Sequence, residues 1–210
     1  MPKLPNPPGV PQLSALGVHP TERTVLASGT RLWRLYFRGG PHPTAWHDFR
    51  SYGPTDGRYD HREPPPQVQA RKILYGAPSG PVCVAEVYQQ IRTIDKSRRD
   101  PWLVAFDLTR ELPLIDMSSA WPTRAKASQA INSGSRMRAR RWSQQIYEAF
   151  PSIEGIYYPS SMYMNHPAVA LYERATDAIP TAPAFHRSLN DPALLSSLQN
   201  VATIVGYSLV

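Results

Sequence analysis

The sequence contains very little cysteine and no long hydrophobic run. Cys83 is the only cysteine among 210 residues, which excludes an intrachain disulfide and any zinc site built on several cysteines. No stretch approaches the roughly 20 consecutive apolar residues that a membrane-spanning helix needs. The N-terminal residues, MPKLPNPPGVPQL, also lack the apolar core of a signal peptide. We therefore expect a cytoplasmic protein that suits a reducing compartment and has no membrane partner.

Signatures of two hydrolase classes are missing as well. The chain has neither the His-Glu-x-x-His motif of many zinc hydrolases nor the Gly-x-Ser-x-Gly turn of serine hydrolases. His42, His47, Asp48 and His61 do fall in one region, but their spacing matches no standard zinc motif. We expect neither a metal ion nor a resident cofactor.

The composition indicates a folded, basic protein. Hydrophobic residues make up 41% and charged residues 19% of the chain, and the formal net charge is +7. This balance is typical of globular proteins, and the positive charge attracts nucleic acid, an acidic protein or a phosphorylated small molecule. Prolines crowd the first dozen positions. Because proline excludes regular helix and central strand, we expect residues 1–23 to be an extended arm ahead of one domain over residues 24–210.

Hydrophobic periodicity predicts helices and strands in that domain. A helix is expected over residues 82–92, and one long helix, or two broken near Gly134, over 125–149. Residues 102–108 and 112–117 predict two strands joined by a tight turn, and the stretch 38–70 predicts a functional loop. Further strands are expected at 31–37, 72–77, 155–159, 169–172 and 201–210. One α+β domain with a mixed sheet is the simplest arrangement.

Five short motifs occur in a fixed order along the chain. They are Gly29-Thr-Arg-Leu-Trp-Arg34, Gly57-Arg58-Tyr59-Asp60, Leu74-Tyr75-Gly76-Ala77, Val84-Ala85-Glu86-Val87 and Tyr157-Tyr158-Pro159-Ser160. Their order and spacing resemble the RES family, which is named for an arginine, a glutamate and a serine in its active site. The resemblance covers about residues 28–175.

The resemblance implies a fold, an activity and a partner. RES proteins resemble ADP-ribosyltransferases in fold, so a single α+β domain with a mixed or antiparallel sheet and flanking helices is expected. They are similar to toxins of bacterial toxin–antitoxin pairs that deplete NAD⁺ by hydrolysis or phosphorolysis. The resemblance therefore implies NAD⁺ as substrate, water or inorganic phosphate as the second reactant, and a helix-turn-helix antitoxin as partner.

Three charged residues of these motifs suit the cleavage of NAD⁺. Loss of nicotinamide leaves positive charge on the ribose, as in glycoside cleavage. Because arginine is the best phosphate donor, Arg34 and Arg58 are assigned to the NAD⁺ phosphates or to attacking phosphate. Glu86 is assigned to a ribose hydroxyl and to the developing cation. Each has an ordinary alternative: a sheet-edge salt bridge for Arg34, pairing with Asp56 or Asp60 for Arg58, and a solvent-facing position or pairing with Arg92 or Lys72 for Glu86.

Polar and aromatic residues complete the predicted site. Ser160 is expected to bond a ribose hydroxyl or the nicotinamide amide, with Ser161 as its rival, and its alternative is a turn hydroxyl. Tyr75 is expected to shape the nicotinamide pocket, and Tyr36 to line it. The alternative for Tyr75 is core packing. Which serine acts, which nucleophile attacks, the oligomeric state and the biological role all stay open.

Other function classes compete with this hypothesis. Arg136, Arg138, Arg140 and Arg141 lie beside Trp142 in one helical region, which suggests phosphate binding by a nucleic-acid-binding module. These arginines spread around the helix instead of lining one face, so direct nucleic-acid binding is disfavoured, and a solvated face that meets an acidic antitoxin is the alternative. ADP-ribosyl transfer to a macromolecule is a further alternative for the enzyme.

Overall fold

Eleven strands and a set of short helices make up residues 4–210, the part of the chain that the computed structural model describes. The strands are β1 (Arg23–Leu26), β2 (Arg31–Phe37), β3 (Arg50–Gly53), β4 (Gln67–Gly76), β5 (Thr93–Ile94), β6 (Pro101–Asp107), β7 (Leu112–Asp116), β8 (Gly155–Pro159), β9 (Pro167–Tyr172), β10 (Phe185–Ser188) and β11 (Ser208–Leu209). The α-helices are α1 (Val10–Leu16), α2 (Gly80–Tyr88), α3 (Trp121–Arg124), α4 (Ala130–Ser133), α5 (Arg136–Ala149) and α6 (Leu195–Val205). Short 3₁₀ helices are η1 (Pro20–Glu22), η2 (Glu173–Ala178) and η3 (Pro192–Leu194).

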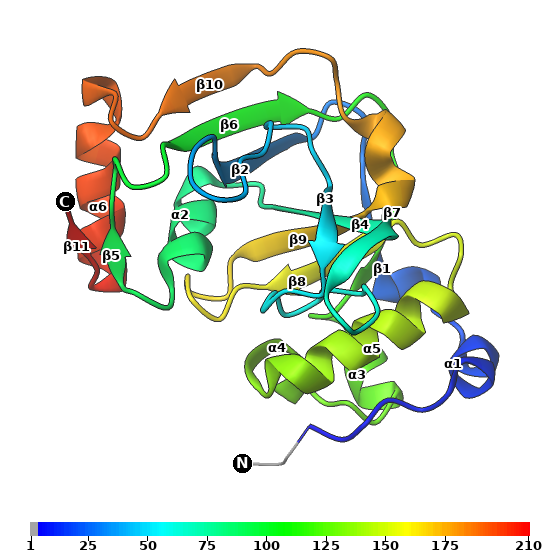
Figure 1. Ribbon diagram of the computed structural model, residues 1–210. Helices are drawn as coiled ribbons and strands as arrows, with labels where there is room; N and C mark the ends of the chain where they lie inside the picture. The colour runs from blue at the N-terminus through cyan, green and yellow to red at the C-terminus, as the bar shows by residue number, and fades with distance from the viewer. Residues whose placement is uncertain (1–3) are drawn as a thin grey trace.

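Two sheets form the centre of the molecule. One has six strands in the order β1-β7-β8-β9-β4-β3, and the other has three in the order β10-β6-β2. Only β7 and β8 run parallel in the larger sheet, and the smaller sheet is fully antiparallel. Figure 1 shows α6 at one side of the molecule and α1, α3, α4 and α5 grouped below the larger sheet. The expected single α+β domain with mixed sheet and flanking helices is confirmed.

Most of the predicted elements have their counterparts in the structure. The expected strands at 31–37 and 155–159 have the same bounds as β2 and β8, and β4 and β9 contain the strands expected at 72–77 and 169–172 almost entirely. The helix expected at 82–92 is α2, which begins and ends somewhat earlier. The helical region at 125–149 is broken at Gly134, between α4 and α5.

One prediction about the strands was wrong. Residues 201–210 do not form one strand, because residues 195–205 form α6, in which Leu198, Val201 and Ala202 recur at helical spacing on the buried side. A short apolar run leaves strand and helix undecided by periodicity. Gly206, with a φ of +67°, ends the helix in the left-handed conformation that favours glycine. The strands expected at 102–108 and 112–117 are present as β6 and β7, and the short connection between them passes the chain from one sheet to the other.

The N-terminal arm is packed against the domain, which corrects the expectation of an extended segment. Its α1 begins with a proline in the first turn, where no backbone hydrogen bond is lost. Leu13 is fully buried, and Trp142 Nε1 in α5 donates to the carbonyl of Pro5 at 3.0 Å. Trp121 Nε1 likewise donates to Gly17 at 3.1 Å. The arm therefore contributes to the hydrophobic core instead of lying in solvent; its residues 1–3 lie outside the described part.

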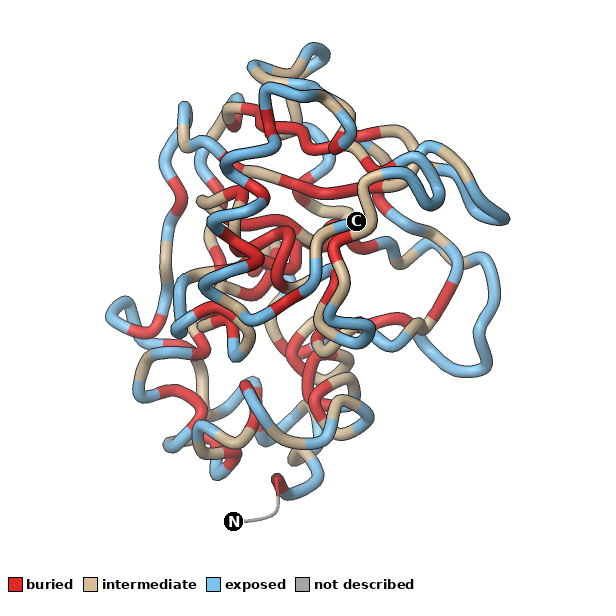
Figure 2. The backbone as a smooth tube through the Cα atoms, turned by 90° about the vertical axis from the view of Figure 1, so that its left-hand side faces the viewer, coloured by how far each residue is buried: buried red, intermediate tan, exposed pale blue. Residues whose placement is uncertain are grey.

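The core joins the two sheets and brings two predicted site residues together. Leu32 and Phe106 from the smaller sheet pack with Leu74 and Leu171 from the larger sheet in one buried cluster. Figure 2 shows this buried backbone surrounded by exposed loops. A bridge between Trp33 and Ala77, with reciprocal hydrogen bonds of 2.7 and 2.9 Å, connects β2 directly to the end of β4. It thereby places the neighbouring strand segments, which carry Arg34 and Tyr75, side by side.

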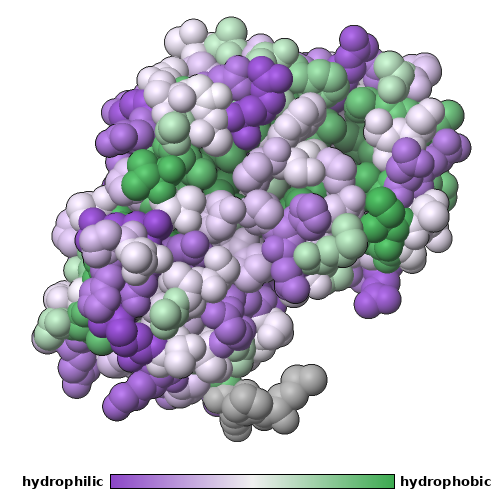
Figure 3. Space-filling model, turned by 180° about the vertical axis from the view of Figure 1, so that it is seen from behind, coloured by the Kyte–Doolittle hydropathy of each residue, from purple (hydrophilic) through white to green (hydrophobic). Residues whose placement is uncertain are grey.

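The surface carries scattered hydrophobic side chains. Val68, Met164 and Val210 are among the most exposed large hydrophobic residues, and they belong to separate elements or loops. On the face seen in Figure 3, hydrophobic patches are small and separated by hydrophilic ones. None of the helices within residues 4–210 has the length and apolar character needed to cross a membrane.

Candidate functional site

A cavity of about 570 Å³ brings the predicted site residues together. Arg34, Tyr36, Arg58, Tyr75 and Glu86 all line it, although they come from β2, the loop after β3, β4 and α2. Its volume falls within the range of ordinary ligand pockets. Ser161 also lines the cavity, whereas Ser160 lies behind the wall. Sequence order alone therefore identified segments that folding collects around one space.

Arg34 is a buried cation held by backbone carbonyls. Its side chain donates from Nη1 to the carbonyl oxygens of Trp46 and Asp48, at 2.7 and 2.8 Å. Burial, and to a smaller extent the nearby charge of Arg50, lower the pKa of Arg34 to about 10. No carboxylate pairs with Arg34 within residues 4–210. The alternative of a sheet-edge salt bridge is therefore wrong, and the guanidinium charge is available to an anionic ligand.

Arg58 is likewise a largely buried cation that donates to a backbone carbonyl. Its Nη1 donates to the carbonyl of Gly134 at 2.7 Å, at the break between α4 and α5. Burial lowers the pKa of Arg58, with a smaller effect from Arg136. Neither expected carboxylate neutralises it, because Asp56 pairs with Arg136 at 2.8 Å and Asp60 pairs with Arg62 at 2.7 Å. Arg34 and Arg58 thus both line the cavity without carboxylate partners in the described chain.

Glu86 is held by a serine 74 residues further along the chain. Ser160 Oγ donates to Glu86 Oε1 at 2.5 Å and accepts from the backbone N–H of Met162 at 3.2 Å. Ser160 is fully buried. Since Glu86 lines the cavity and Ser160 does not, the serine orients the carboxylate from behind. Neither Arg92 nor Lys72 pairs with Glu86 in the described residues, so that alternative is wrong.

The two tyrosines differ in their hydrogen bonding. Tyr75 has a buried hydroxyl that finds no hydrogen-bond partner within residues 4–210. A Cβ at Gly57 would overlap this hydroxyl, so glycine leaves the space that Tyr75 occupies. Burial raises the pKa of Tyr75 well above its usual value, which keeps the group a neutral donor. Tyr36 instead shares a 2.6 Å hydrogen bond with His186 Nε2, and its ring lies beneath Arg34.

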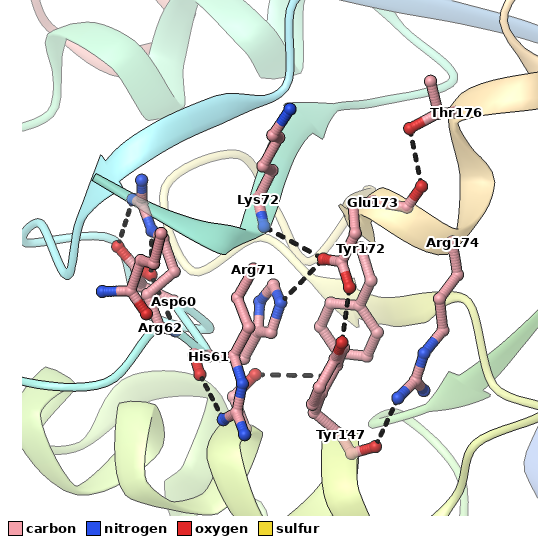
Figure 4. Close-up of polar contacts among 12 residues, drawn as sticks. Asp60, His61, Arg62, Arg71, Lys72, Tyr147, Tyr172, Glu173, Arg174 and Thr176 are labelled. Carbon is pink, nitrogen blue, oxygen red and sulfur yellow. Dashed lines mark hydrogen bonds and ion pairs between the residues drawn. The ribbon is translucent and has the colours of Figure 1, made fainter. Parts of the chain in front are cut away.

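A buried polar network supports the loop that carries Arg58, and sequence reasoning missed it. Asp60, His61 and Arg62 follow Arg58 closely and are fully buried. His61 Nε2 lies 3.2 Å from Glu173 Oε2 and packs between the rings of Tyr147 and Tyr172, as Figure 4 shows. The only signal in the sequence was three consecutive ionisable residues, a pattern that is usually exposed.

The pKa values of His61 and Glu173 in this network are both lowered from their ordinary values. Burial lowers the pKa of His61 against the opposing effect of Glu173. Burial alone would raise the pKa of Glu173, but hydrogen bonds from His61, Tyr147 and the backbone of Lys72 lower it to about 2. Glu173 is therefore ionised in the folded protein and His61 is neutral near pH 7. Nδ1 of His61 is buried and unpartnered in the described structure.

The arginines of α5 are engaged in contacts within the chain. Arg136 and Arg140 both bond to Asp56, at 2.8 and 3.3 Å. Arg138 donates to the carbonyl of Leu4, and Arg141 donates to Asn6 at 3.4 Å. These contacts direct the arginines to the cavity loop and to the N-terminal arm, which weighs against a free phosphate-binding stripe for nucleic acid.

The rest of the described structure has a second hollow but no further group of predicted catalytic residues. A second hollow of about 430 Å³ lies beside β10, lined by Trp102, His186 and Arg187, and it contains none of the predicted catalytic residues. Among residues 4–210, no three histidine, cysteine, aspartate or glutamate side chains gather into a group that could hold a metal ion. The first cavity also has lining residues that the sequence did not single out, notably Arg50, Gln89 and Arg99.

Comparisons with known proteins agree with this geometry. The family model described as RES domain matches residues 31–190, well over half of the 210-residue chain. The fold is similar to a chain in the crystal structure of the M. tuberculosis MbcT–MbcA toxin–antitoxin complex, with a TM-score of 0.57, 16% identity, and coverage of 91% of this chain and 96% of that chain. A search of curated protein sequences finds no match. Because the family model matches most of the chain, the chain belongs to the RES domain family.

Proposed function

We propose that this protein is a toxin enzyme that cleaves the nicotinamide–ribose bond of NAD⁺. The observation that carries the proposal is the Ser160–Glu86 pair at the wall of a cavity that also holds Arg34 and Arg58 without carboxylate partners. A dianionic pyrophosphate joined to a ribose needs this combination of cationic donors and one oriented carboxylate. No resident cofactor takes part, because NAD⁺ is the substrate.

Different residues of the cavity bind the substrate and stabilise the charge that develops during cleavage. Arg34 and Arg58 hold the pyrophosphate, or inorganic phosphate when phosphate is the nucleophile. As the C–N bond breaks, its electron pair leaves with nicotinamide, and the positive charge that develops on the ribose faces Glu86. An oxygen of water or phosphate then bonds to C1′, and any proton released passes to solvent. Tyr75 shapes the nicotinamide end of the cavity.

The same proposal includes a protein partner. The similar solved chain comes from a toxin–antitoxin complex, and this chain carries a net charge of +7 that suits an acidic partner. We propose an antitoxin of the helix-turn-helix type that covers the cavity, in the cytoplasm. Mixing with the cognate antitoxin then blocks NAD⁺ turnover, and a complex that leaves turnover unchanged would contradict this part of the proposal.

The test of the reaction is direct. Purified protein, free of antitoxin, is incubated with NAD⁺ with and without inorganic phosphate, and nicotinamide and the ribosyl product are both quantified. Nicotinamide release by the native protein and its loss in Glu86→Ala supports the proposal, and a phosphate requirement identifies a phosphorylase. Absence of nicotinamide release from folded protein overturns the proposal. The alternative, ADP-ribosyl transfer onto a macromolecule, is then tested by incubating the protein with labelled NAD⁺ and a cell extract.

A further inference from the structure

Gln89 lies between the carboxylate of Glu86 and the basic helix α5. Its Nε2 donates to the backbone carbonyl of Glu86 at 2.6 Å and approaches Glu86 Oε2 at 3.3 Å. Its Oε1 accepts from Arg136 Nη2 at 2.5 Å. Arg136 also pairs with Asp56 at 2.8 Å. A continuous series of polar contacts thus leads from Asp56 through Arg136 and Gln89 to Glu86, along the wall of the cavity.

The chemistry of arginine decides how the Gln89 amide is turned. A guanidinium has donors only, so Gln89 must direct its oxygen to Arg136. Its NH₂ group then faces Glu86, where it is the favourable partner for a carboxylate. The backbone carbonyl of Glu86, which accepts from Gln89 Nε2 at 2.6 Å, favours the same orientation. Without Arg136, the amide oxygen loses its partner and the side chain is held at its NH₂ end only. Arg136 therefore acts on Glu86 by holding the other end of the Gln89 amide.

Both oxygens of the Glu86 carboxylate are thereby engaged. Ser160 holds Oε1 at 2.5 Å from one side, and Gln89 approaches Oε2 at 3.3 Å from the other. Two contacts from different directions limit rotation of the carboxylate about its last bond. Such restraint matters when a carboxylate has to face a ribose carbon, since reaction rates respond steeply to misplacement.

We propose that Gln89 is a positioning residue for Glu86 and that Arg136 holds the Gln89 side chain in place for this role. The proposal rests on the proposed function for its kinetic consequence, because Glu86 is the group that faces the reacting ribose. The proposal gives α5 a specific part in the site, because Arg136, the first residue of α5, influences the geometry of Glu86 in α2. A competing explanation is that Gln89 and Arg136 only fasten α2 to α5.

Gln89→Glu separates these two explanations. The substituted carboxylate keeps the shape of glutamine and still accepts from Arg136, so the tie between the helices is retained or strengthened. It cannot donate to Glu86, and it adds a negative charge beside it. A positioning role predicts a fall in kcat of about tenfold or more with KM changed less than about twofold. A role limited to fastening the helices predicts an unchanged kcat, with any effect of the lost contact to the Glu86 carbonyl confined to thermal stability.

Arg136→Gln and Arg140→Gln form a matched pair. Both remove one positive charge from α5, and both residues bond to Asp56, but only Arg136 contacts Gln89. Arg140 does not line the cavity. We expect Arg136→Gln to lower kcat as Gln89→Glu does, and Arg140→Gln to keep the native rate. Equal effects of the two arginine substitutions would overturn the proposal.

A second measurement does not depend on enzymatic turnover. Carbon-13 NMR of the Glu86 carboxyl carbon reports its surroundings in the free protein. The signal should move in Gln89→Glu and Arg136→Gln and stay in place in Arg140→Gln. If native protein releases no nicotinamide but the signal moves as expected, the proposed function fails and the positioning contact stands. If native protein is active and both substitutions leave the signal and kcat unchanged, the positioning role is wrong.

Discussion

The hydroxyl of Ser160 donates a 2.5 Å hydrogen bond to Glu86 across 74 residues of sequence. The serine follows β8 and the glutamate lies in α2, so the contact depends on α2 packing beside the larger sheet. A charge-assisted bond of this kind is short and directional. It identifies Ser160 as the group that orients the carboxylate, while Ser161 faces the cavity.

Replacement of Ser160 should therefore impair catalysis through Glu86. Ser160→Ala leaves one carboxylate oxygen without its closest donor, and we expect kcat to fall about tenfold to a hundredfold with a smaller change in KM. The comparison is Ser161→Ala, which removes a hydroxyl that touches the cavity but not Glu86. Steady-state nicotinamide release measures both. A larger loss in Ser161→Ala than in Ser160→Ala would show that the serine at the cavity wall is the functional one.

Arg34 and Arg58 should discriminate substrates by their phosphates. We expect Arg34→Gln and Arg58→Gln to raise KM for NAD⁺ by about tenfold to a hundredfold, the equivalent of one lost charge-assisted hydrogen bond. Nicotinamide riboside carries no phosphate, so its cleavage should change little. Kinetics with both substrates give the comparison, and Arg187→Gln, at an exposed ion pair with Asp191, is the control. Equal losses on both substrates would place the arginines outside phosphate binding.

Stability should decline as the pH falls below neutrality. Burial lowers the pKa of His61 below its ordinary value of 6.5, so below that value the unfolded chain binds a proton that the folded chain does not. Each such proton lowers the free energy of unfolding by at most about 1.4 kcal/mol per pH unit. Glu173 adds a second loss at lower pH, because its pKa is about 2 in the folded protein against 4.5 ordinarily.

Urea unfolding at pH 7.5, 6.5 and 5.5 measures the effect of His61. We expect His61→Gln to be less stable than native protein at pH 7.5 and less sensitive to acid between these values. His47→Gln, at a side chain that is 56% exposed, is the control and should follow the native curve. A free energy of unfolding that is constant or rises towards pH 5.5 would contradict the neutral state assigned to His61.

The N-terminal arm should contribute measurably to stability. Leu13 is fully buried between α1 and the rest of the core, so Leu13→Ala should lower the free energy of unfolding by about 2–5 kcal/mol, as buried leucines do. Leu195 is 41% exposed, and Leu195→Ala should cost much less. Urea denaturation of the two variants gives the comparison. Equal small effects would mean that the arm is not part of the folded core in solution.

The local elements and the family can be recognised from the sequence. Alternation of apolar residues was enough for β2 and β8, and Gly134 marked the break between α4 and α5. Five ordered motifs identified Arg34, Arg58, Tyr75, Glu86 and Ser160 as a set, and the fold collects them around one cavity or directly behind its wall. These features are local, since propensity, turn chemistry and residue identity act within a few positions.

Which of these groups become partners follows from the folded arrangement of the chain. The Ser160–Glu86 bond, the tie from Arg136 through Gln89, and the burial of His61 beside Glu173 join residues separated by 47 to 112 positions. Periodicity also misassigned residues 201–205, which belong to α6, because a short apolar segment adopts the conformation that its neighbours can pack against. The proline content of the arm likewise did not show that α1 packs on the core. Long-range packing, which no local pattern encodes, set the charge environment of the site and thereby the roles open to its residues.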